Sequence, residues 1–474
     1  MDWSLFTLLR SEIILTVLIL IVLSLEIIYT GKDKNPLIIG ITILFLVFTI
    51  IGFIPVGEGE LFGGMYHTDR LTHFYKSILN VGVLIILFQS VSWLKGDGIK
   101  ENKSSEFYLL LFSSLLGMNF LISAGDMLMF YLGMELSTLP LAALAAYELY
   151  KRRSTEAGIK LVLLAALSSA VALMGISLLY GSTGTLNFQE LSTKLTGTSL
   201  ETMATVFFLS GLAFKISLVP FHFWTADVYE GAPVPVTAYL SVISKGAAVF
   251  ILMVVLYRVL PSMESIWKDF IYILTALTMT IGNLFALRQK NLKRFLAFSS
   301  VAQAGFILLG IIAGDIKGMT SVVYFVLIYV FSNLAAFGVI QSISNHTGKE
   351  KISDYEGLYR TNPLLSLTMM LALFSLAGIP PVAGFFGKFF LFMSAAGQGY
   401  YWLVVIAVVN IVISLYYYLL VIRAMFLRQS DTAIPKFKND FWMRAGLVIC
   451  VIGIISIGIY SPVYDYIYSL VSLY

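Results

Sequence analysis

The chain has 474 residues, of which 58% are hydrophobic and 12% are charged, and its mean hydropathy is +0.88. This composition excludes an ordinary soluble domain, and a net charge of only +4 gives no reason to expect a nucleic-acid partner. With Cys450 as its single cysteine and four scattered histidines, the sequence has no intramolecular disulfide and no spacing typical of a Cys/His metal site. We therefore predict an integral membrane protein.

About fourteen stretches of the chain are long and apolar enough to cross a bilayer as α-helices, which requires roughly 20 residues each. They begin near Ile13, Leu37, Leu71, Phe107, Met127, Ile159, Met203, Pro235, Phe270, Phe295, Thr320, Leu364, Tyr401 and Ala445. These stretches are continuously apolar, whereas the strands of a membrane barrel alternate between polar and apolar residues. We therefore predict an all-α polytopic membrane protein, with residues 1–474 forming a single integral membrane domain.

The basic residues of the predicted loops lie mostly on one side of the membrane. Loops after odd-numbered helices hold about 20 lysines and arginines, among them Lys32, Lys100, Lys293 and Arg294, whereas the opposite loops hold about 7, among them Lys76. Because cytoplasmic loops are enriched in Lys and Arg, both termini are expected on the outer side. A missed or invented helix would scramble this alternation, so it supports an even number of helices.

Two of the apolar stretches contain helix breakers together with a lysine. Pro220 interrupts residues 212–237, and two prolines and three glycines interrupt residues 374–392. Proline removes a backbone hydrogen bond, and such breaks survive at membrane depth only where protein or a wet cavity satisfies the freed groups. We therefore expect helices 7 and 12 to be discontinuous.

The two breaks lie about 160 residues apart, five helices on along the chain. This spacing predicts that helices 4 to 8 and helices 9 to 13 are two copies of one five-helix unit. Because each unit has an odd number of helices, the two copies must be inverted in the membrane. Interrupted helices at matching positions of inverted repeats indicate the ion site of a transporter.

Five ionisable side chains lie inside the predicted helices, where a charge is costly and usually marks a path for ions or protons. They are Glu135, Lys160, Lys215, Lys245 and Lys388. Glu135 in helix 5 and Lys160 at the start of helix 6 have opposite signs on adjacent helices, and we expect them to pair. The alternative is a buried ion pair with a purely structural role. For Lys245, the alternative is a side chain that snorkels or bonds a carbonyl.

Two further polar residues, His222 and Asp227, follow the break at Pro220. A histidine changes its charge close to neutral pH, so this pair is a candidate gate or relay for protons. A half-buried polar turn would account for both residues without any chemistry.

Three stretches surround the charged residues: FYLGMELSTLP around Glu135, FKISLVPFHFWTADVYEGAPVPVT around Lys215, and SLAGIPPVAGFFGKFFLF around Lys388. With others between residues 69 and 426, they resemble the antiporter-like membrane subunits of respiratory complex I. The resemblance implies a fourteen-helix fold with inverted repeats and a proton channel, with the glutamate and the four lysines as its carriers. The family often has histidine at the position of Gln303 in helix 10, where a glutamine can still hold a chain of water.

The resemblance also implies a function. The chain is expected to be a proton-translocating membrane subunit of an NADH-quinone oxidoreductase in the bacterial inner membrane, among other membrane and peripheral subunits. Quinone reduction in a partner would alter the distance between Glu135 and Lys160. Lys215 would then change its protonation, and a proton would pass by Lys245 to Lys388 for outward release.

The sequence contains no ligand set for haem, flavin or an iron–sulfur cluster. NADH, FMN, iron–sulfur clusters and quinone are therefore expected in partner subunits, with no cofactor in this chain. Two alternatives use the same fold, namely a subunit of a multisubunit Na+/H+ antiporter and a subunit of a membrane-bound hydrogenase. A third alternative is an assembly scaffold whose charges are inert.

Overall fold

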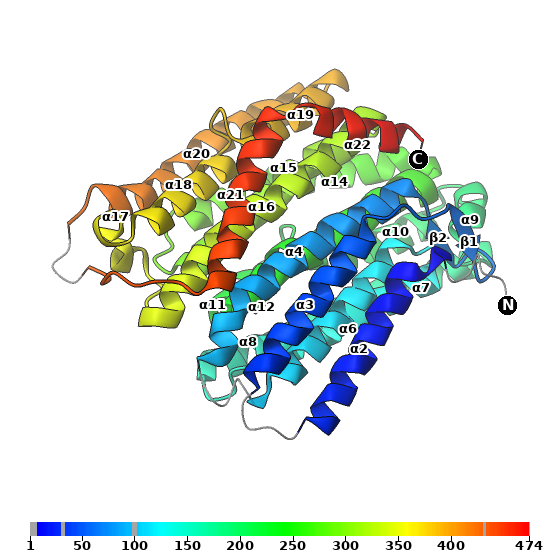
Figure 1. Ribbon diagram of the computed structural model, residues 1–474. Helices are drawn as coiled ribbons and strands as arrows, with labels where there is room; N and C mark the ends of the chain where they lie inside the picture. The colour runs from blue at the N-terminus through cyan, green and yellow to red at the C-terminus, as the bar shows by residue number, and fades with distance from the viewer. Residues whose placement is uncertain (1–6, 30–33, 97–101, 430–432, 474) are drawn as a thin grey trace.

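The computed structural model describes residues 7–29, 34–96, 102–429 and 433–473, most of which are helical (Figure 1). Lys32 and Lys100, which were counted with the loop charges, lie outside the described residues. Thirteen helices of the described part are long and apolar enough to cross a membrane. They are α2 (Arg10–Ile28), α3 (Asn35–Gly52), α4 (Arg70–Lys95), α6 (Ser104–Ile122), α7 (Met127–Ala145), α8 (Arg152–Thr183), α10 (Ser199–Ile216), the span Val234–Val259, the span Pro261–Ala286 with α14 (Glu264–Ala286), α15 (Leu292–Ala313), α16 (Ile316–Thr347), α20 (Tyr401–Phe426) and α21 (Phe441–Ile459).

A fourteenth crossing consists of two shorter apolar helices, α18 (Pro363–Ala377) and α19 (Ala383–Gly397). The predicted number of crossings is therefore confirmed. The remaining short elements of the described part are β1 (Gly59–Leu61), β2 (Tyr66–Thr68), α9 (Phe188–Lys194), α11 (Phe223–Gly231), a 3-10 turn (Ile352–Tyr355), α17 (Leu358–Thr361) and α22 (Pro462–Ser472). The span Val234–Val259 contains α12 (Val234–Tyr239), a π-helical turn (Leu240–Ser244), α13 (Lys245–Val254) and a second π-helical turn (Val255–Val259).

The two predicted helix breaks are confirmed. Helix 7 is divided into α10 and the half-helix α11, and helix 12 is divided into α18 and α19. Each first half ends at a residue with a left-handed backbone, Ser217 with φ +68° and Gly378 with φ +87°. The backbone carbonyls at these ends are free of helical partners, so they can accept hydrogen bonds from side chains in the interior.

The two five-helix units pack in the same order. α6 packs on α7 as α14 packs on α15, and α7 packs on α8 as α15 packs on α16. The divided helix of each unit then packs on α8 and on α16, respectively. This common order agrees with the inverted repeats expected from the sequence. Figure 1 shows the two units on either side of α4, which contacts both α6 and α16.

The two ends of the bundle differ. The hairpin end carries the antiparallel pair β1–β2, in which the backbone N–H of His67 donates to the carbonyl of Ser123 at the end of α6 (2.8 Å). The C-terminal helix α22 lies at this end too, because Tyr466 packs on Phe74 near the start of α4. The opposite end, which we call the α11 end, gathers the first turns of α8 and α15 and the last turns of α4, α11 and α16 around one pocket.

The helices where the two units meet are the most deeply buried. The span Val234–Val259 and α15 are buried along their whole apolar length, whereas α7, α8 and α20 expose large leucine and valine side chains. A polar residue on the span or on α15 is therefore enclosed by protein rather than lipid, and it must find its hydrogen bonds inside the bundle.

Gly384, in the first turn of α19, provides a test of the second break. A Cβ added there would lie 1.7 Å from the carbonyl oxygen of Ser375 in α18, and backbone cannot rotate away. We expect Gly384→Ala to force the two half-helices apart and to destabilise the protein by about 1–3 kcal/mol or more, as overpacking does. The measurement is the midpoint of thermal unfolding in detergent.

The matched control is Gly397→Ala at the other end of α19, where an added Cβ meets nothing within 4 Å. Equal midpoints for the two alanine variants would contradict the close approach of α18 and α19.

Candidate functional site

Lys215 is near the end of α10, two residues before the first break. Its Nζ donates to Ser137 Oγ (2.5 Å), Thr138 Oγ1 (2.6 Å) and the carbonyl of Met134 (3.2 Å), all on α7. The side chain is only 7% exposed. Three oxygen acceptors therefore satisfy a buried amine without a direct ion pair.

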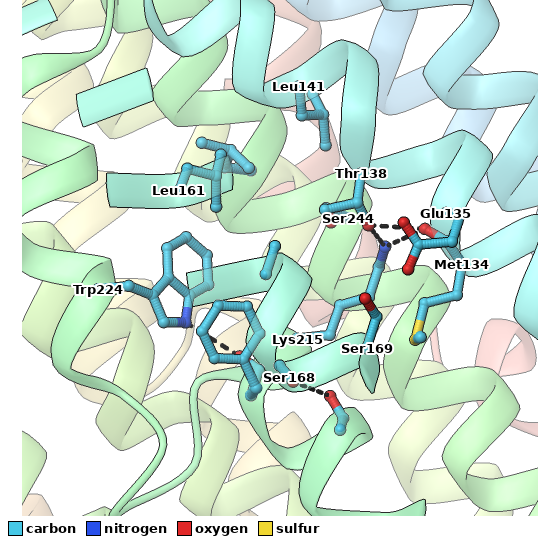
Figure 2. A pocket seen from close by; sticks show the side chains of 14 residues that line it. Met134, Glu135, Thr138, Leu141, Leu161, Ser168, Ser169, Lys215, Trp224 and Ser244 are labelled. Carbon is cyan, nitrogen blue, oxygen red and sulfur yellow. Dashed lines mark hydrogen bonds between the residues drawn. The ribbon is translucent and has the colours of Figure 1, made fainter. Parts of the chain in front are cut away.

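Glu135 lines the same pocket as Lys215, and Figure 2 shows its carboxylate beside the lysine amine. Among the residues that the structure describes, Glu135 forms no ion pair. The pocket is also lined by Ser168, Ser169 and Ser244, whose hydroxyl groups offer hydrogen-bond partners to water. The arrangement is an acid and an amine in one polar pocket, each able to influence the charge of the other.

The expected pair of Glu135 with Lys160 is not formed between these described residues, so that prediction is wrong for this structure. Lys160 Nζ contacts Glu156 Oε1 and Asp227 Oδ2 instead, each at 2.7 Å. The reason is the register of the two helices. Gly158 of α8 packs against the last turns of α7, seven or more residues beyond Glu135. At 1.5 Å per residue, Lys160 therefore lies roughly 10 Å from the level of the glutamate.

Asp227, on the half-helix α11, is shared between two cations. Lys160 contacts its Oδ2, and Arg294 at the start of α15 donates to its Oδ1 (2.6 Å). These two charge-assisted hydrogen bonds favour the ionised form of the Asp227 carboxyl group. Arg294 also donates to Glu230 (3.1 Å), which accepts from Arg153 (3.2 Å). An ionised network thus crosses the α11 end, where sequence analysis had interpreted Arg294 only as a loop charge.

His222 directly precedes α11. The residue is 3% exposed, and its ring packs at a tilt against Phe223, with ring centroids 4.7 Å apart. Neither ring nitrogen has a hydrogen-bond partner among the described residues. The role of His222 and Asp227 as a gate or relay stays a prediction.

Lys245 begins α13 directly after a π-helical turn, in the fully buried span. Its Nζ donates to Ser300 Oγ on α15 (2.8 Å) and lies 5.5 Å from the ring centroid of Tyr229. The side chain is 5% exposed, so it does not snorkel to a surface. Lys245 therefore connects the first unit to α15 of the second.

Lys388, on α19, faces the end of α18. Its Nζ donates to the carbonyls of Leu376 (2.7 Å) and Ala377 (3.1 Å) and lies 4.6 Å from the ring centroid of Phe306. Gln303 donates to the same Leu376 carbonyl (2.9 Å). A cation is favourable at a helix C-terminus. Lys388 and Gln303 thus meet at the free carbonyls of the second break.

Tyr418, on α20, completes the connection, and sequence analysis missed it. Its hydroxyl bonds Ser299 Oγ (2.5 Å) and accepts from Gln303 Nε2 (3.2 Å). Ser299 is the neighbour of Ser300, which bonds Lys245, and Gln303 shares the Leu376 carbonyl with Lys388. Hydroxyl and amide groups of α15 therefore lie between Lys245 and Lys388. The available signal was the run of three tyrosines at 416–418, in a helix whose other residues are mostly aliphatic.

Residues 124–414 match the sequence family described as NADH:quinone oxidoreductase/Mrp antiporter, TM. The chain belongs to this family. Its relatives include the NADH-quinone oxidoreductase subunit N of Phocaeicola vulgatus, which is 49% identical over 466 residues, 98% of either chain. A chain of respiratory complex I from Thermus thermophilus with bound aureothin has a TM-score of 0.80 at 31% identity, covering 95% of this chain and 97% of that one.

A chain of the Mrp complex from Dietzia sp. DQ12-45-1b has a TM-score of 0.87 at 20% identity, covering 100% of this chain and 97% of that one. At this identity the likeness concerns the fold alone. The family resemblance seen in the sequence is therefore confirmed, and the relatives are named as subunits of NADH-quinone oxidoreductase. Within the described part of this family member, no group of three or more His, Cys, Asp or Glu residues could hold a metal ion.

A buried ion pair lies at the hairpin end, away from Lys215, Lys245 and Lys388. Lys76 donates to Glu12 Oε1 on α2, to the hydroxyl of Tyr66 (3.2 Å) and to Ser123 Oγ (2.6 Å). The hydroxyl of Tyr66 also donates to Glu12 Oε2 (3.1 Å). Lys76 had been assigned to a loop, but it lies in α4 and is 2% exposed. All three donors of the amine have acceptors, as in a structural ion pair.

Proposed function

We propose that the chain is a proton-translocating membrane subunit of a bacterial NADH-quinone oxidoreductase. One observation carries the proposal: Lys215, Lys245 and Lys388 are all buried, and hydroxyl, amide and helix-end carbonyl groups hold them in series from the first unit to the second. Buried amines that can gain and lose a proton, each next to exchangeable groups, are suited to passing protons in steps. The 49% identity to a named subunit N supports the same function.

In this mechanism Glu135 controls Lys215. A carboxylate nearby favours the charged amine, and its withdrawal favours release of the proton. Lys160, held by Asp227 in this structure, would draw Glu135 away when it changes partner. The proton released by Lys215 is taken up by Lys245 through water and passes along Ser300, Gln303 and Tyr418 to Lys388, which releases it outward.

We also propose which partner subunits, cofactors and membrane surround the chain. Partner subunits of the complex hold NADH, FMN, iron–sulfur clusters and quinone, and no nucleic acid is involved. The chain is a single membrane domain in the bacterial inner membrane, in contact with lipid. Its hairpin end and both termini face outward, as the loop charges favour.

The test is purification of the complex through an affinity tag on this chain. We expect the other subunits of an NADH-quinone oxidoreductase to co-purify, and we expect vesicles containing the complex to take up protons when NADH is added in sodium-free buffer. Co-purification with small antiporter subunits and no NADH oxidation would overturn the proposal in favour of a Na+/H+ antiporter. If NADH-driven transport required sodium, the transported ion would be Na+ rather than a proton.

Tyr418→Phe tests the connection between Lys245 and Lys388. The change removes a hydroxyl that bonds both Ser299 and Gln303. A single hydrogen bond is worth roughly 0.5–1.5 kcal/mol, so we expect NADH-driven proton uptake to slow by about 2- to 13-fold. Tyr416→Phe, whose side chain is 59% exposed on the same helix, is the control and should leave uptake unchanged. Equal rates for the two variants would remove Tyr418 from the route.

A further inference from the structure

The carboxylate of Asp227 joins the two five-helix units. One oxygen contacts Lys160 of α8 in the first unit (2.7 Å), and the other contacts Arg294 of α15 in the second (2.6 Å). Asp227 itself lies on α11, between these two helices, and α11 packs on both of them. Any change at Lys160 therefore alters the net charge that Arg294 meets across a single carboxyl group.

Lys293, the residue before Arg294, also binds the end of α11. Lys293, which is 5% exposed, donates to the carbonyl of Ala232 just after α11 (3.1 Å) and pairs with Glu350 in the loop after α16 (3.2 Å). Two adjacent residues of α15 thus hold the last turn of α11 and its C-terminal end. The first turn of α15 cannot move without changing these contacts.

α15 also carries the polar groups that contact Lys245 and the carbonyl beside Lys388. Ser300 and Gln303 lie six and nine residues after Arg294, which corresponds to about 9 Å and about 14 Å along an α-helix. Because α15 is buried along its length, it is enclosed by packed side chains, and packed interiors transmit displacements. A shift at Arg294 therefore changes how Ser300 meets Lys245 and how Gln303 meets the carbonyl beside Lys388.

From this geometry we propose that Arg294 is a positioning residue that couples Lys160 in the first unit to the Lys245–Lys388 connection in the second, through the shared carboxylate of Asp227. The inference rests on the proposed proton-translocating function. While Lys160 contacts Asp227, two cations share one carboxylate. When Lys160 leaves for Glu135, Arg294 keeps Asp227 to itself, and the stronger attraction draws the start of α15 toward α11. The strength of the contact between Arg294 and Asp227 thus differs between the state with Lys160 on Asp227 and the state with Lys160 on Glu135. A coupling mechanism requires such a difference in interaction between its two states.

The experiment measures NADH-driven proton uptake per assembled complex in vesicles, for Arg294→Gln, Arg294→Lys, Lys160→Gln and the double variant Lys160→Gln/Arg294→Gln. We expect Arg294→Gln to slow uptake about fivefold or more, the lower end of typical coupling between sites. Arg294→Lys should lie between this variant and the wild type, because lysine keeps the charge but cannot bridge Asp227 and Glu230 with a planar fork. In the Lys160→Gln background, Arg294→Gln should cause no further loss.

The double variant separates coupling from a merely structural role. Independent, multiplicative losses from Lys160→Gln and Arg294→Gln would overturn the proposal, since they would show that Arg294 does not act through the state of Lys160. Arg428→Gln is the matched control, because Arg428 pairs with Glu356 in a separate ion pair (2.7 Å), and it should retain wild-type uptake. If Arg294→Gln does not assemble, wild-type uptake in Arg294→Lys overturns the proposal.

Lys215→Ala distinguishes this inference from the proposed function. Loss of uptake in Lys215→Ala with wild-type uptake in Arg294→Gln would overturn the coupling role and leave the proposed function standing. Wild-type uptake in both would overturn the proposed function as well.

Discussion

Lys215→Ala should slow NADH-driven proton uptake by about a hundredfold or more, because a positioned proton-transfer group typically contributes roughly 10²–10⁴-fold. The lysine amine is held by Ser137, Thr138 and the carbonyl of Met134, and its pocket continues to the hydroxyl of Ser244. Alanine leaves these acceptors in place but removes the group that gains and loses the proton. The measurement is initial proton uptake by vesicles that contain equal amounts of assembled complex.

Two companion variants sharpen this result. Glu135→Gln keeps the shape of the acid but removes its charge, so uptake should fall less than in Lys215→Ala, because the carrier itself remains. Lys194→Ala, at an exposed lysine that pairs with Glu190, controls for the loss of a positive charge. If Lys215→Ala matched Lys194→Ala in its rate, Lys215 would lie outside the proton route.

Lys76→Met should destabilise the protein by about 3–5 kcal/mol, because removing one partner of a buried ion pair leaves the other charge unpaired. Among the residues that the structure describes, Glu12, which is 3% exposed, would retain only the hydroxyl of Tyr66 as a donor. The measurement is the thermal midpoint and the yield of the purified chain in detergent. Lys194→Met, at a lysine that is 46% exposed and pairs with Glu190, which is 58% exposed, is the control and should change neither quantity.

The double variant Glu12→Gln/Lys76→Met tests the physical reason. Because it removes both charges, it should recover most of the lost stability, as replacement of a whole buried pair often does. If the double variant were no more stable than Lys76→Met, the loss would arise from packing around the lysine stem rather than from an unpaired carboxylate.

The helices, the two breaks and the buried lysines were predictable because each depends on local composition. Hydropathy identifies spans that must be helical in lipid, and prolines with glycines identify where a helix cannot continue. The charges at Lys215, Lys245 and Lys388 were conspicuous in apolar surroundings. In each case a single stretch of sequence contained the whole signal.

The pairing of these charges was not predictable, because it depends on how far one helix slides along another. Close packing at Gly158 sets the level of α8 on α7 and separates Lys160 from Glu135. Asp227 reaches Lys160 because α11 continues along α8 beyond the break, as far as the contact of Gly231 with Arg153 and Ala157. The position of Lys76 inside α4 escaped notice because its apolar stretch begins only a few residues before it.

The uncharged members of the site were missed for another reason. A serine or tyrosine such as Ser300 or Tyr418 is not conspicuous in an apolar helix, because its hydroxyl group can bond nearby backbone at little cost in free energy. Their roles emerge only when α15 and α20 come together around Gln303.

The most direct test of the account is an experimental density map of the assembled complex at a resolution that shows ordered water. We expect water molecules between Lys215 and Lys245, and beside Gln303 and Tyr418 as far as Lys388, completing a hydrated route through the middle of the chain. Dry apolar packing around these amines, with no water between them, would contradict it.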